Sequence, residues 1–333
     1  MRPARQWFVH QRNRHARNIV GQVMGSALVL DQFGDTNHLR LARIETRPLL
    51  ATEVRIGVTV AGLNPVDWQI VESRALATVF GLELPMGFGN DFAGIVVETG
   101  PYVRRWSVGD RVFGGARGRA VATSIVLDEN HPSLRRTPPT VSDLEAGVLD
   151  IAGRTASAVA DALSVQPGET VLVGAAGGGV GSILTQLLVR HGANVIGTGS
   201  LASTDYIRSL GARPMRYGDE LAADIAASNI PIAATADLHG TDTAQAAIRS
   251  GVPPHRVVTI EADQPPAGVV RVNGSDASPD ALDRLLELIS TKSLRIPIAA
   301  TYTLDQFHLA ISHQRSRHVH GKIAISTSLS NAS

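Results

Sequence analysis

Short apolar runs alternate with turn residues along the first part of the chain, at intervals of about ten positions. Four runs show the pattern: Ala27–Leu30, Glu53–Val60, Gly94–Glu98 and Ala120–Leu127. Runs of this length and spacing are typical of short strands joined by turns. The pattern predicts an all-β domain in this part of the chain.

A helical pattern replaces the strands after Pro139. Ser142 followed by Glu145 has the spacing of a capping box, in which each side chain binds a backbone amide at the start of a helix. Apolar residues then recur at helical spacing as far as Leu163. The pattern predicts helical structure from Ser142 to Leu163.

From Pro167 onward, short apolar strands alternate with helical patterns, which indicates βαβ units and a parallel sheet. The clearest unit begins with a strand at Thr170–Val173 and continues through a glycine-rich loop. A helix with one apolar face follows and ends at Gly192, and Asn194–Gly197 forms a second strand. The order strand, loop, helix and strand is the context in which a glycine loop binds a dinucleotide.

The loop carries the dinucleotide fingerprint with alanine in its first position, Ala176-x-Gly178-x-x-Gly181. The first position makes a tight turn, the second lets the backbone approach a pyrophosphate, and the third lets helix and strand pack closely. Gly179 and Val180 lie at the predicted helix N-terminus, where free amides and the helix dipole favour phosphate. The sequence therefore predicts dinucleotide binding at this loop.

The end of the second strand bears on the choice of dinucleotide. An acid there would bind the ribose hydroxyls of NAD and repel the extra phosphate of NADP. The chain instead has Ser200 and Ser203, and Asp205 comes later, where we interpret it as a surface acid in a first helical turn. The sequence favours NADP(H), with Arg208 and Arg317 either adding positive charge or lying solvated at the surface.

Composition excludes several classes of protein. The chain is 44% hydrophobic and 18% charged, and it has no apolar run of the roughly 18 residues that a membrane span needs. Zero cysteines exclude a disulfide scaffold, a thiol nucleophile, an iron–sulfur cluster and cysteine-ligated zinc. The sequence shows no secretory signal, so we predict a cytoplasmic protein with no membrane partner.

The charge is unevenly distributed. Residues 1–23 contain five arginines and no acid, and without them 26 basic residues face 30 acidic ones, a net charge of −4. We interpret 1–23 as a disordered or upstream-extended basic leader, in preference to a targeting peptide or a nucleic-acid-binding arm. The acidic remainder makes nucleic acid an unlikely partner.

Five motifs follow one another along the chain: Gly62–Trp68, Gly89–Gly94, Val108–Phe113, Ala176–Ser182 and His318–Ile323. In this order they resemble the zinc-independent medium-chain dehydrogenase/reductases, specifically the quinone oxidoreductase (zeta-crystallin-like) group. The resemblance covers about residues 24–326.

The resemblance implies an α/β fold with a Rossmann dinucleotide-binding domain inserted in a GroES-like β-barrel domain. We accordingly expect a discontinuous GroES-like catalytic domain at 24–145 and 290–333, and an NADP-binding Rossmann domain at 146–289. The family also implies NADPH-dependent reduction of a quinone or an activated C=C bond, in a homodimer.

The resemblance also bears on metal binding. Zinc-dependent relatives carry a cysteine at the position of Asn64, a histidine at that of Asn90 and a third ligand near Gly153. A group of histidines lies near the C-terminus, at His313, His318 and His320. This group has no carboxylate at ligand spacing, so we predict no metal site.

Without a metal, hydride transfer depends on positioning and hydrogen bonding. Asn64 is the first catalytic candidate because its amide could donate to the nicotinamide or to a substrate carbonyl; alternatively, it is a turn residue before Pro65. Asp67 either acts beside the cofactor or caps the next helix, and Asn90 is a candidate for the substrate site. Arg154 completes the catalytic candidates, although relatives commonly have an apolar residue there, which puts the substrate class in question.

The remaining candidates follow from the resemblance and bind the cofactor. Besides Asn64 they are Pro65, Trp68, Thr155, Tyr217, Leu238, Ile260, Glu261 and Arg317. Thr155 matches a threonine near the nicotinamide, while Tyr217 and Arg317 match residues near the adenosine and its phosphate. Tyr217 is equally well explained as an ordinary strand-end tyrosine. His239 is not expected to donate a proton.

We therefore expect an NADPH-dependent, zinc-free oxidoreductase that reduces quinones or α,β-unsaturated carbonyls by hydride transfer. Two alternatives remain open. The first is a 2-enoyl-thioester reductase, and the second is an NADPH-binding regulatory or RNA-binding protein, for which the basic leader is the main argument.

Overall fold

The protein is described by a computed structural model that covers residues 24–262 and 264–327. Over these residues the chain forms two compact units. The first contains the chain up to Asp150, Ala300–Arg317 and the segment from Ile323 onward. The second contains Ile151–Ala299 and His318–Lys322. The basic leader at 1–23 lies outside the described residues.

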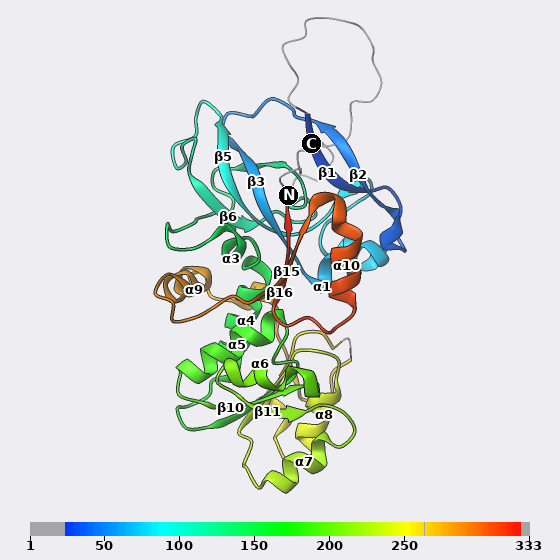
Figure 1. Cartoon of the computed structure of the whole chain (residues 1–333), viewed down its shortest axis with the longest axis vertical. Coiled ribbons are helices and arrows are strands. Elements are labelled where there is room, and N and C mark those ends of the chain that lie inside the picture. The colour runs from blue at the N-terminus through cyan, green and yellow to red at the C-terminus, as the bar shows by residue number, and fades with distance from the viewer. Residues whose placement is uncertain (1–23, 263, 328–333) are drawn as a thin grey trace, which may run out of the picture. The chain divides into compact units, whose positions relative to one another are not determined.

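The first unit is built on two β-sheets (Figure 1). The smaller has the order β2-β1-β4, from Leu39–Glu45, Met24–Leu30 and Met86–Gly87. The larger has the order β15-β16-β3-β5-β6-β8, from Ile298–Thr303, Lys322–Ser326, Glu53–Leu63, Asp91–Thr99, Arg111–Gly115 and Arg135–Arg136, and β7 (Ser124–Asp128) also pairs with β3. The long strand β3 is thus the centre of the larger sheet.

Alternation of apolar and polar residues explains why these segments form strands. Val54 and Ile56 of β3 pack with Phe92 of β5 and Val112 of β6 in one apolar cluster, and none of the four is exposed to solvent. The helices of this unit are α1 (Pro65–Glu72), α2 (Arg74–Val79), α3 (Asp143–Gly147) and α10 (Phe307–Arg315).

The second unit is a parallel sheet with the order β11-β10-β9-β12-β13-β14. Its strands are Arg213–Arg216, Asn194–Gly199, Thr170–Val173, Ala234–Asp237, Val257–Thr259 and Val270–Arg271. Numbered along the chain from β9, this is the order 3-2-1-4-5-6 of the Rossmann fold. The predicted parallel sheet is therefore present.

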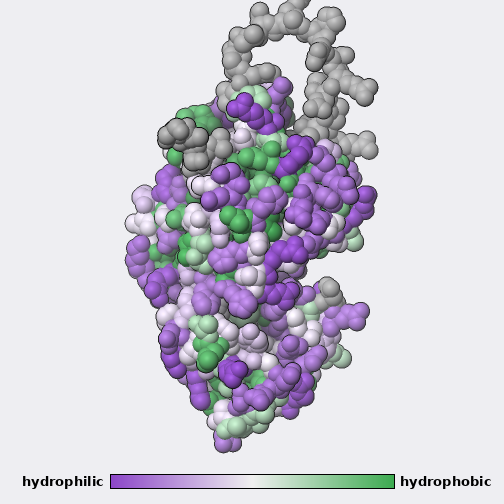
Figure 2. Space-filling view, turned by 45° about the vertical axis from the view of Figure 1, so that its right-hand side comes forward, coloured by the Kyte–Doolittle hydropathy of each residue, from purple (hydrophilic) through white to green (hydrophobic). Residues whose placement is uncertain are grey.

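Within the described residues, four helices lie between successive strands of this sheet: α5 (Gly179–Arg190), α6 (Thr204–Ser209), α7 (Leu221–Ser228) and α8 (Asp242–Arg249). Helix α4 (Asp150–Leu163) precedes β9, and α9 (Ala281–Ser290) follows β14. Short 3-10 turns lie at Thr36–His38, Leu201–Ser203, Pro254–Arg256, Gly274–Asp276 and Leu304–Gln306. Hydrophilic residues dominate the face in Figure 2. Among the described helices, none has the length and apolar character required to cross a membrane.

The predicted helix over 142–163 is divided in the structure. The capping box of Ser142 and Glu145 is present and begins α3, but α3 ends at Gly147 and α4 begins at Asp150. Gly147 lies so close to β3 that a Cβ would be 2.9 Å from a methyl carbon of Val60. The break lets the backbone of α3 pack against the sheet, a contact that helical periodicity alone does not reveal.

The strand expected at Ala120–Leu127 also begins later than predicted, at Ser124. The residues before it form an isolated bridge from Ala122 to Ala27 of β1 and bond to neighbouring segments. Their burial explains their apolar character without a regular strand.

Candidate functional site

The glycine-rich loop connects β9 to α5 in the second unit, and close packing dictates its residues. A Cβ on Gly181 would lie 2.2 Å from the carbonyl oxygen of Ala175, which explains the need for glycine there. At Gly178 a Cβ would meet the Ala175 carbonyl oxygen at 3.3 Å, a tight contact. Apart from its chain neighbours, no second atom of the described residues would lie within 4 Å, which leaves room for a ligand on the other sides. Ala175 adopts a φ of 51°, which makes the turn into the loop.

Helix α5 begins directly after this loop, with Gly178 as its N-cap residue. No side chain caps this terminus, so the first-turn amides of Gly179, Val180 and Gly181 can bind an anion. The open cradle at Gly178 and the helix terminus together fit the pyrophosphate of a dinucleotide, as the fingerprint predicts.

The end of β10 carries a chain of hydrogen bonds. The Ser200 and Ser203 hydroxyls are 2.9 Å apart, and the Ser203 hydroxyl is 2.9 Å from Nε2 of His320. The structure therefore joins the two predicted serines and adds His320, which the sequence reasoning considered only as a metal ligand and rejected. His320 lies 117 positions from Ser203 along the chain, so no local pattern connects them.

Asp205 does not take part in this chain. It pairs with Arg208 at 2.8 Å on the surface, three residues further along α6. The Asp205 side chain is 95% exposed, which agrees with its interpretation as a surface acid.

The carboxyl ends of β12 and β13 bring together a second polar group. Asp237 accepts hydrogen bonds from the amides of Ala244 at 2.9 Å and His239 at 3.3 Å, and burial raises its pKa to about 6. Nδ1 of His239 lies 2.6 Å from a carboxylate oxygen of Glu261. Parallel sheets bind ligands at this edge.

The predicted cofactor residues Leu238 and Ile260 flank this group. Leu238 is buried directly after β12, and Ile260 follows β13, where its amide bonds to the carbonyl of Asp237 at 3.4 Å. The structure thus places Leu238, Ile260 and Glu261 at one edge of the Rossmann sheet.

The first unit buries three of the predicted catalytic residues in one network. Asp67 accepts from the backbone amide of Asn64 at 2.7 Å and from the side-chain amide of Asn90 at 2.6 Å. All three residues are at least 96% buried. Asp67 therefore caps α1 and fixes Asn90, which is the second of the two roles considered for it from the sequence.

Pro65 and Trp68 also have clear structural roles. Pro65 is exposed at the first position of α1, where its fixed φ favours helix. The indole of Trp68 donates to Gln314 of α10 at 2.5 Å, and the Arg315 guanidinium lies 4.8 Å from the centre of the same ring. Trp68 thus joins α1 to α10.

Arg154 and Thr155 lie on α4 in the second unit. The Thr155 hydroxyl donates to the carbonyl of Ile151 one turn earlier, at 2.7 Å. A Cβ on Gly274 would lie 3.1 Å from this hydroxyl, so the turn at Gly274–Asp276 packs closely against α4.

Tyr217 and Arg317 are both at the surface. The amide of Tyr217 reaches the carbonyl of Gly199 at 3.4 Å, so its backbone lies at the end of β10, while its side chain is 60% exposed. Arg317 is exposed with a φ of 60° and belongs to the first unit.

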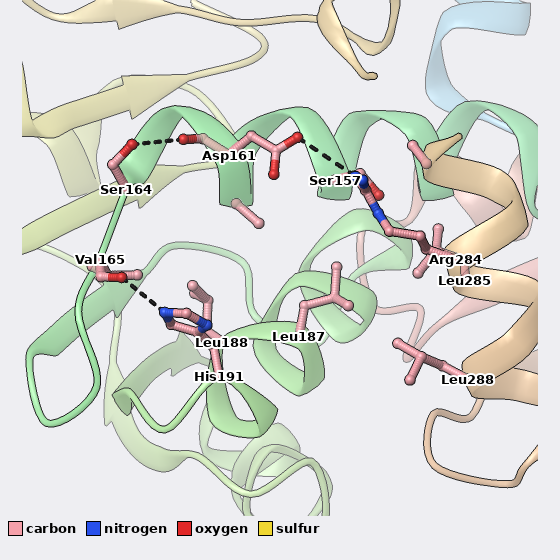
Figure 3. A pocket seen from close by; sticks show the side chains of 12 residues that line it. Ser157, Asp161, Ser164, Val165, Leu187, Leu188, His191, Arg284, Leu285 and Leu288 are labelled. Carbon is pink, nitrogen blue, oxygen red and sulfur yellow. Dashed lines mark hydrogen bonds and ion pairs between the residues drawn. The ribbon is translucent and has the colours of Figure 1, made fainter. Parts of the chain in front are cut away.

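A cavity of about 410 Å³ lies elsewhere in the second unit, between α4, α5 and α9 (Figure 3). Leu187, Leu188, Leu285 and Leu288 give it apolar walls, with Asp161 and Arg284 beside them. None of the predicted site residues lines it.

Within residues 24–262 and 264–327, no group of three or more histidine, cysteine or acidic side chains is arranged to hold a metal. Two of the C-terminal histidines have other contacts: His313 bonds to the Tyr302 hydroxyl at 2.9 Å, and His320 bonds to Ser203.

Comparisons with known proteins agree with this architecture. Residues 50–131 match the alcohol dehydrogenase GroES-like domain. A solved quinone oxidoreductase from Coxiella burnetii is 26% identical with a TM-score of 0.81, over 92% of this chain and 100% of that one. A chloroplastic quinone-oxidoreductase homolog of Spinacia oleracea is 32% identical over 54% of this chain and 56% of its own length. Together these matches support a quinone oxidoreductase-like medium-chain dehydrogenase/reductase family. The expected Rossmann domain inserted in a GroES-like domain is confirmed.

Other proteins to which the chain is similar are much larger. The spectinabilin polyketide synthase system protein NorB of Streptomyces orinoci is 35% identical over 49% of this chain, which corresponds to only 7% of NorB. The chain thus spans about half of the spinach relative and a small part of the synthase.

Two further solved structures share the fold of this chain. Escherichia coli quinone oxidoreductase complexed with NADPH has a TM-score of 0.79 at 19% identity, over 91% of this chain and 100% of that one. CurK enoyl reductase has a TM-score of 0.78 at 22% identity, over 91% of this chain and 99% of that one.

Proposed function

We propose that the chain is an NADPH-dependent, zinc-free oxidoreductase that reduces quinones or α,β-unsaturated carbonyls. The observation that carries this proposal is the end of β10, where hydroxyls and an imidazole occupy the place at which NAD enzymes have an acid. The adjoining glycine loop and the uncapped α5 terminus support dinucleotide binding. The NADPH complex of the E. coli fold relative agrees with this choice of cofactor.

When bound, the reduced nicotinamide supplies the hydride. The chain's own residues bind the cofactor and orient it. The α5 amides hold the pyrophosphate, and residues after β12 and β13, Leu238, Ile260 and Glu261, hold the nicotinamide half at the carboxyl edge of the sheet.

Negative charge that develops on a substrate oxygen needs a hydrogen-bond donor. Asn64 and Asn90 are the proposed donors, because Asp67 fixes the backbone of Asn64 and the side chain of Asn90, and a preorganised donor loses little on reaction. Arg154 is the proposed cationic partner at the substrate, and Thr155 and Trp68 are proposed neighbours of the cofactor.

Loss of nicotinamide absorbance, followed in a stopped-flow instrument across a panel of quinones and enones, tests the activity. We expect turnover with NADPH for at least one acceptor class. A complete lack of turnover with every acceptor and both nicotinamides would refute the proposal.

The cofactor preference has its own test. Ser200→Asp introduces the missing acid and is expected to weaken NADPH binding about tenfold or more while NADH binding is kept, because two negative charges then face each other. Fluorescence titration of both nucleotides measures this. An unchanged preference would show that the phosphate binds elsewhere.

Reduction of a 2-enoyl thioester is the second candidate, supported by the similarity to NorB and to the CurK enoyl reductase fold. A short 2-enoyl thioester and the matched free enone distinguish the two. Faster turnover of the thioester favours the second candidate, and faster turnover of the free enone or of a quinone favours the first. A homodimer is the proposed assembly, and light scattering of the purified chain measures it.

A further inference from the structure

The segment His318–Lys322 is attached to the glycine loop of the second unit. The amide of Gly321 donates to the carbonyl of Gly177 at 2.9 Å, and the amide of Lys322 donates to that of Pro297 at 2.8 Å. Gly321 has a φ of 96°, and a Cβ there would lie 2.3 Å from the Pro297 carbonyl, so only glycine allows this approach. The backbone on either side of Gly321 is thereby fixed, and with it the position of His320.

Two further contacts orient the His320 ring. Its plane stacks on Tyr206 of α6, with 4.8 Å between ring centres and 10° between planes. Nε2 meets the buried Ser203 hydroxyl at 2.9 Å. The neighbouring ring atom Cδ2 lies toward the fingerprint loop, since it would be 3.7 Å from a Cβ on Gly177.

The ring therefore lies between two features that face the adenosine half of a dinucleotide. One is the glycine loop, which receives the pyrophosphate, and the other is the end of the second strand, which receives the adenosine ribose. A phosphate on the ribose 2′-oxygen would enter a group made of Ser200, Ser203 and His320. Hydroxyl groups and imidazole N–H groups donate hydrogen bonds to phosphate oxygens.

The electrostatic environment suits an anion. The face of Tyr206 fixes the plane of the imidazole, whose ring nitrogens can donate hydrogen bonds to phosphate oxygens. Burial raises the pKa of the Tyr206 hydroxyl to about 12, so Tyr206 stays neutral and does not repel phosphate.

Arg208 fits this position less well, because it is committed to a surface pair with Asp205. The exposed ring of Tyr217 offers no positive charge.

We propose that His320, held by Tyr206 and joined to Ser203 and Ser200, binds the 2′-phosphate of NADPH and is the residue that makes the chain prefer NADPH to NADH. This inference rests on the proposed function and deepens it.

The test compares nucleotide binding by the full-length chain and by His320→Phe, which keeps an aromatic ring on Tyr206 and removes both ring nitrogens. We expect the dissociation constant for NADPH to rise about 10- to 100-fold, the usual effect of losing a charge-assisted hydrogen bond to phosphate. The dissociation constant for NADH should change less than about threefold, because NADH lacks the 2′-phosphate. The probes 2′,5′-ADP and 5′-AMP should repeat the contrast without the nicotinamide.

The matched control is His318→Phe, the same change two positions earlier on an exposed side chain, which should leave both affinities unchanged. Ser203→Ala is a second, milder variant, which should weaken NADPH binding more than NADH binding. It keeps the inference testable if His320→Phe fails to fold. Circular dichroism checks folding.

The outcomes separate the two proposals. The role of His320 is refuted if the unaltered chain binds NADPH and the variants His320→Phe and Ser203→Ala bind it equally well. It is also refuted if the affinities for NADPH and NADH fall together. In both cases the reductase proposal stands. If the unaltered chain binds neither nucleotide, both proposals fail.

Discussion

At the residue scale, Asp237 is a carboxyl group whose surroundings oppose its charge. It is fully buried at the end of β12 and receives two backbone amides, yet burial outweighs them and raises its pKa to about 6 from a usual 3.8. The folded chain therefore holds a proton on Asp237 more tightly than the unfolded chain does.

This shift predicts a pH-dependent stability. The favourable contribution is complete below about pH 3.8 and is lost as the pH rises through about 6, because the buried group must then ionise. Relative to Asp237→Asn, the unfolding free energy of the unaltered chain should fall by an amount on the order of 3 kcal/mol between about pH 4 and pH 7. Urea denaturation of both proteins at several pH values measures the difference, and parallel curves would contradict the prediction.

Asp67 gives a second prediction at this scale. Asp67→Ala removes the acceptor for Asn64 and Asn90 in a buried network, so the free energy of unfolding should fall by about 3 kcal/mol. Asn90→Ala removes only one of these bonds and should cost about half as much.

The control is Asp224→Ala, an exposed acid in the first turn of α7, which should cost no more than about 0.5 kcal/mol. Chemical denaturation measures all three variants. Equal effects at Asp67 and Asp224 would show that the buried network adds nothing to stability.

At the element scale, the loop between β9 and α5 separates two uses of glycine. A Cβ on Gly181 would lie 2.2 Å from the Ala175 carbonyl oxygen. One on Gly178 would lie 3.3 Å from it and, in the described part of the chain, would meet no second atom within 4 Å beyond its chain neighbours. One glycine thus serves the packing of the chain, and the other leaves room for a ligand.

The two positions should respond differently to alanine. Gly181→Ala forces backbone to move and should lower the melting temperature by several degrees or prevent folding. Gly178→Ala should leave the melting temperature within about two degrees of the unaltered chain. It should weaken NADPH binding at least tenfold, because the methyl group takes the space through which the pyrophosphate approaches the loop. Thermal unfolding paired with nucleotide titration checks both, and equal loss of stability in the two variants would contradict the assignment.

The sequence predicts elements well where one physical period determines them. The β9 strand, the α5 helix and the capping box at Ser142 follow from local spacing, and all three are present. The division between α3 and α4 was missed because it depends on the contact of Gly147 with Val60, far away in the sequence.

The candidate site shows the same limit. The fingerprint glycines and the serines after β10 are local and were identified, whereas His320 reaches Ser203 only through the fold. The available signal was its place directly before Gly321 and Lys322 in the last motif, which does not indicate where the imidazole lies.

At the scale of the whole molecule, the last part of the chain serves both units in turn. Arg317 ends a segment of the first unit, His318–Lys322 belongs to the second, and the chain from Ile323 onward returns to the first, where β16 pairs with β3. Each unit therefore depends on residues from the C-terminal segment.

This arrangement predicts the effect of truncation. A chain that ends at Arg317 loses the pairing of β16 with β3 and the contact of Gly321 with Gly177, so both units should be destabilised together. Limited proteolysis should then cut both the β3 region and the Rossmann unit faster than in the full chain. Removal of the residues after Thr327 is the control, since it keeps both contacts, and a Rossmann unit that stays protected in the shorter chain would contradict the prediction.

The register of β16 limits which insertions and deletions the sequence can accept. Ile323 lies opposite Leu63, and three residues earlier His320 must meet Ser203. Inserting one residue within the strand would turn its apolar side outward, and inserting one between His320 and Gly321 would carry the imidazole away from the serine. We expect descendants of this protein to tolerate length changes in other surface loops, but to inherit this short connection at a constant length as long as they keep their nucleotide preference.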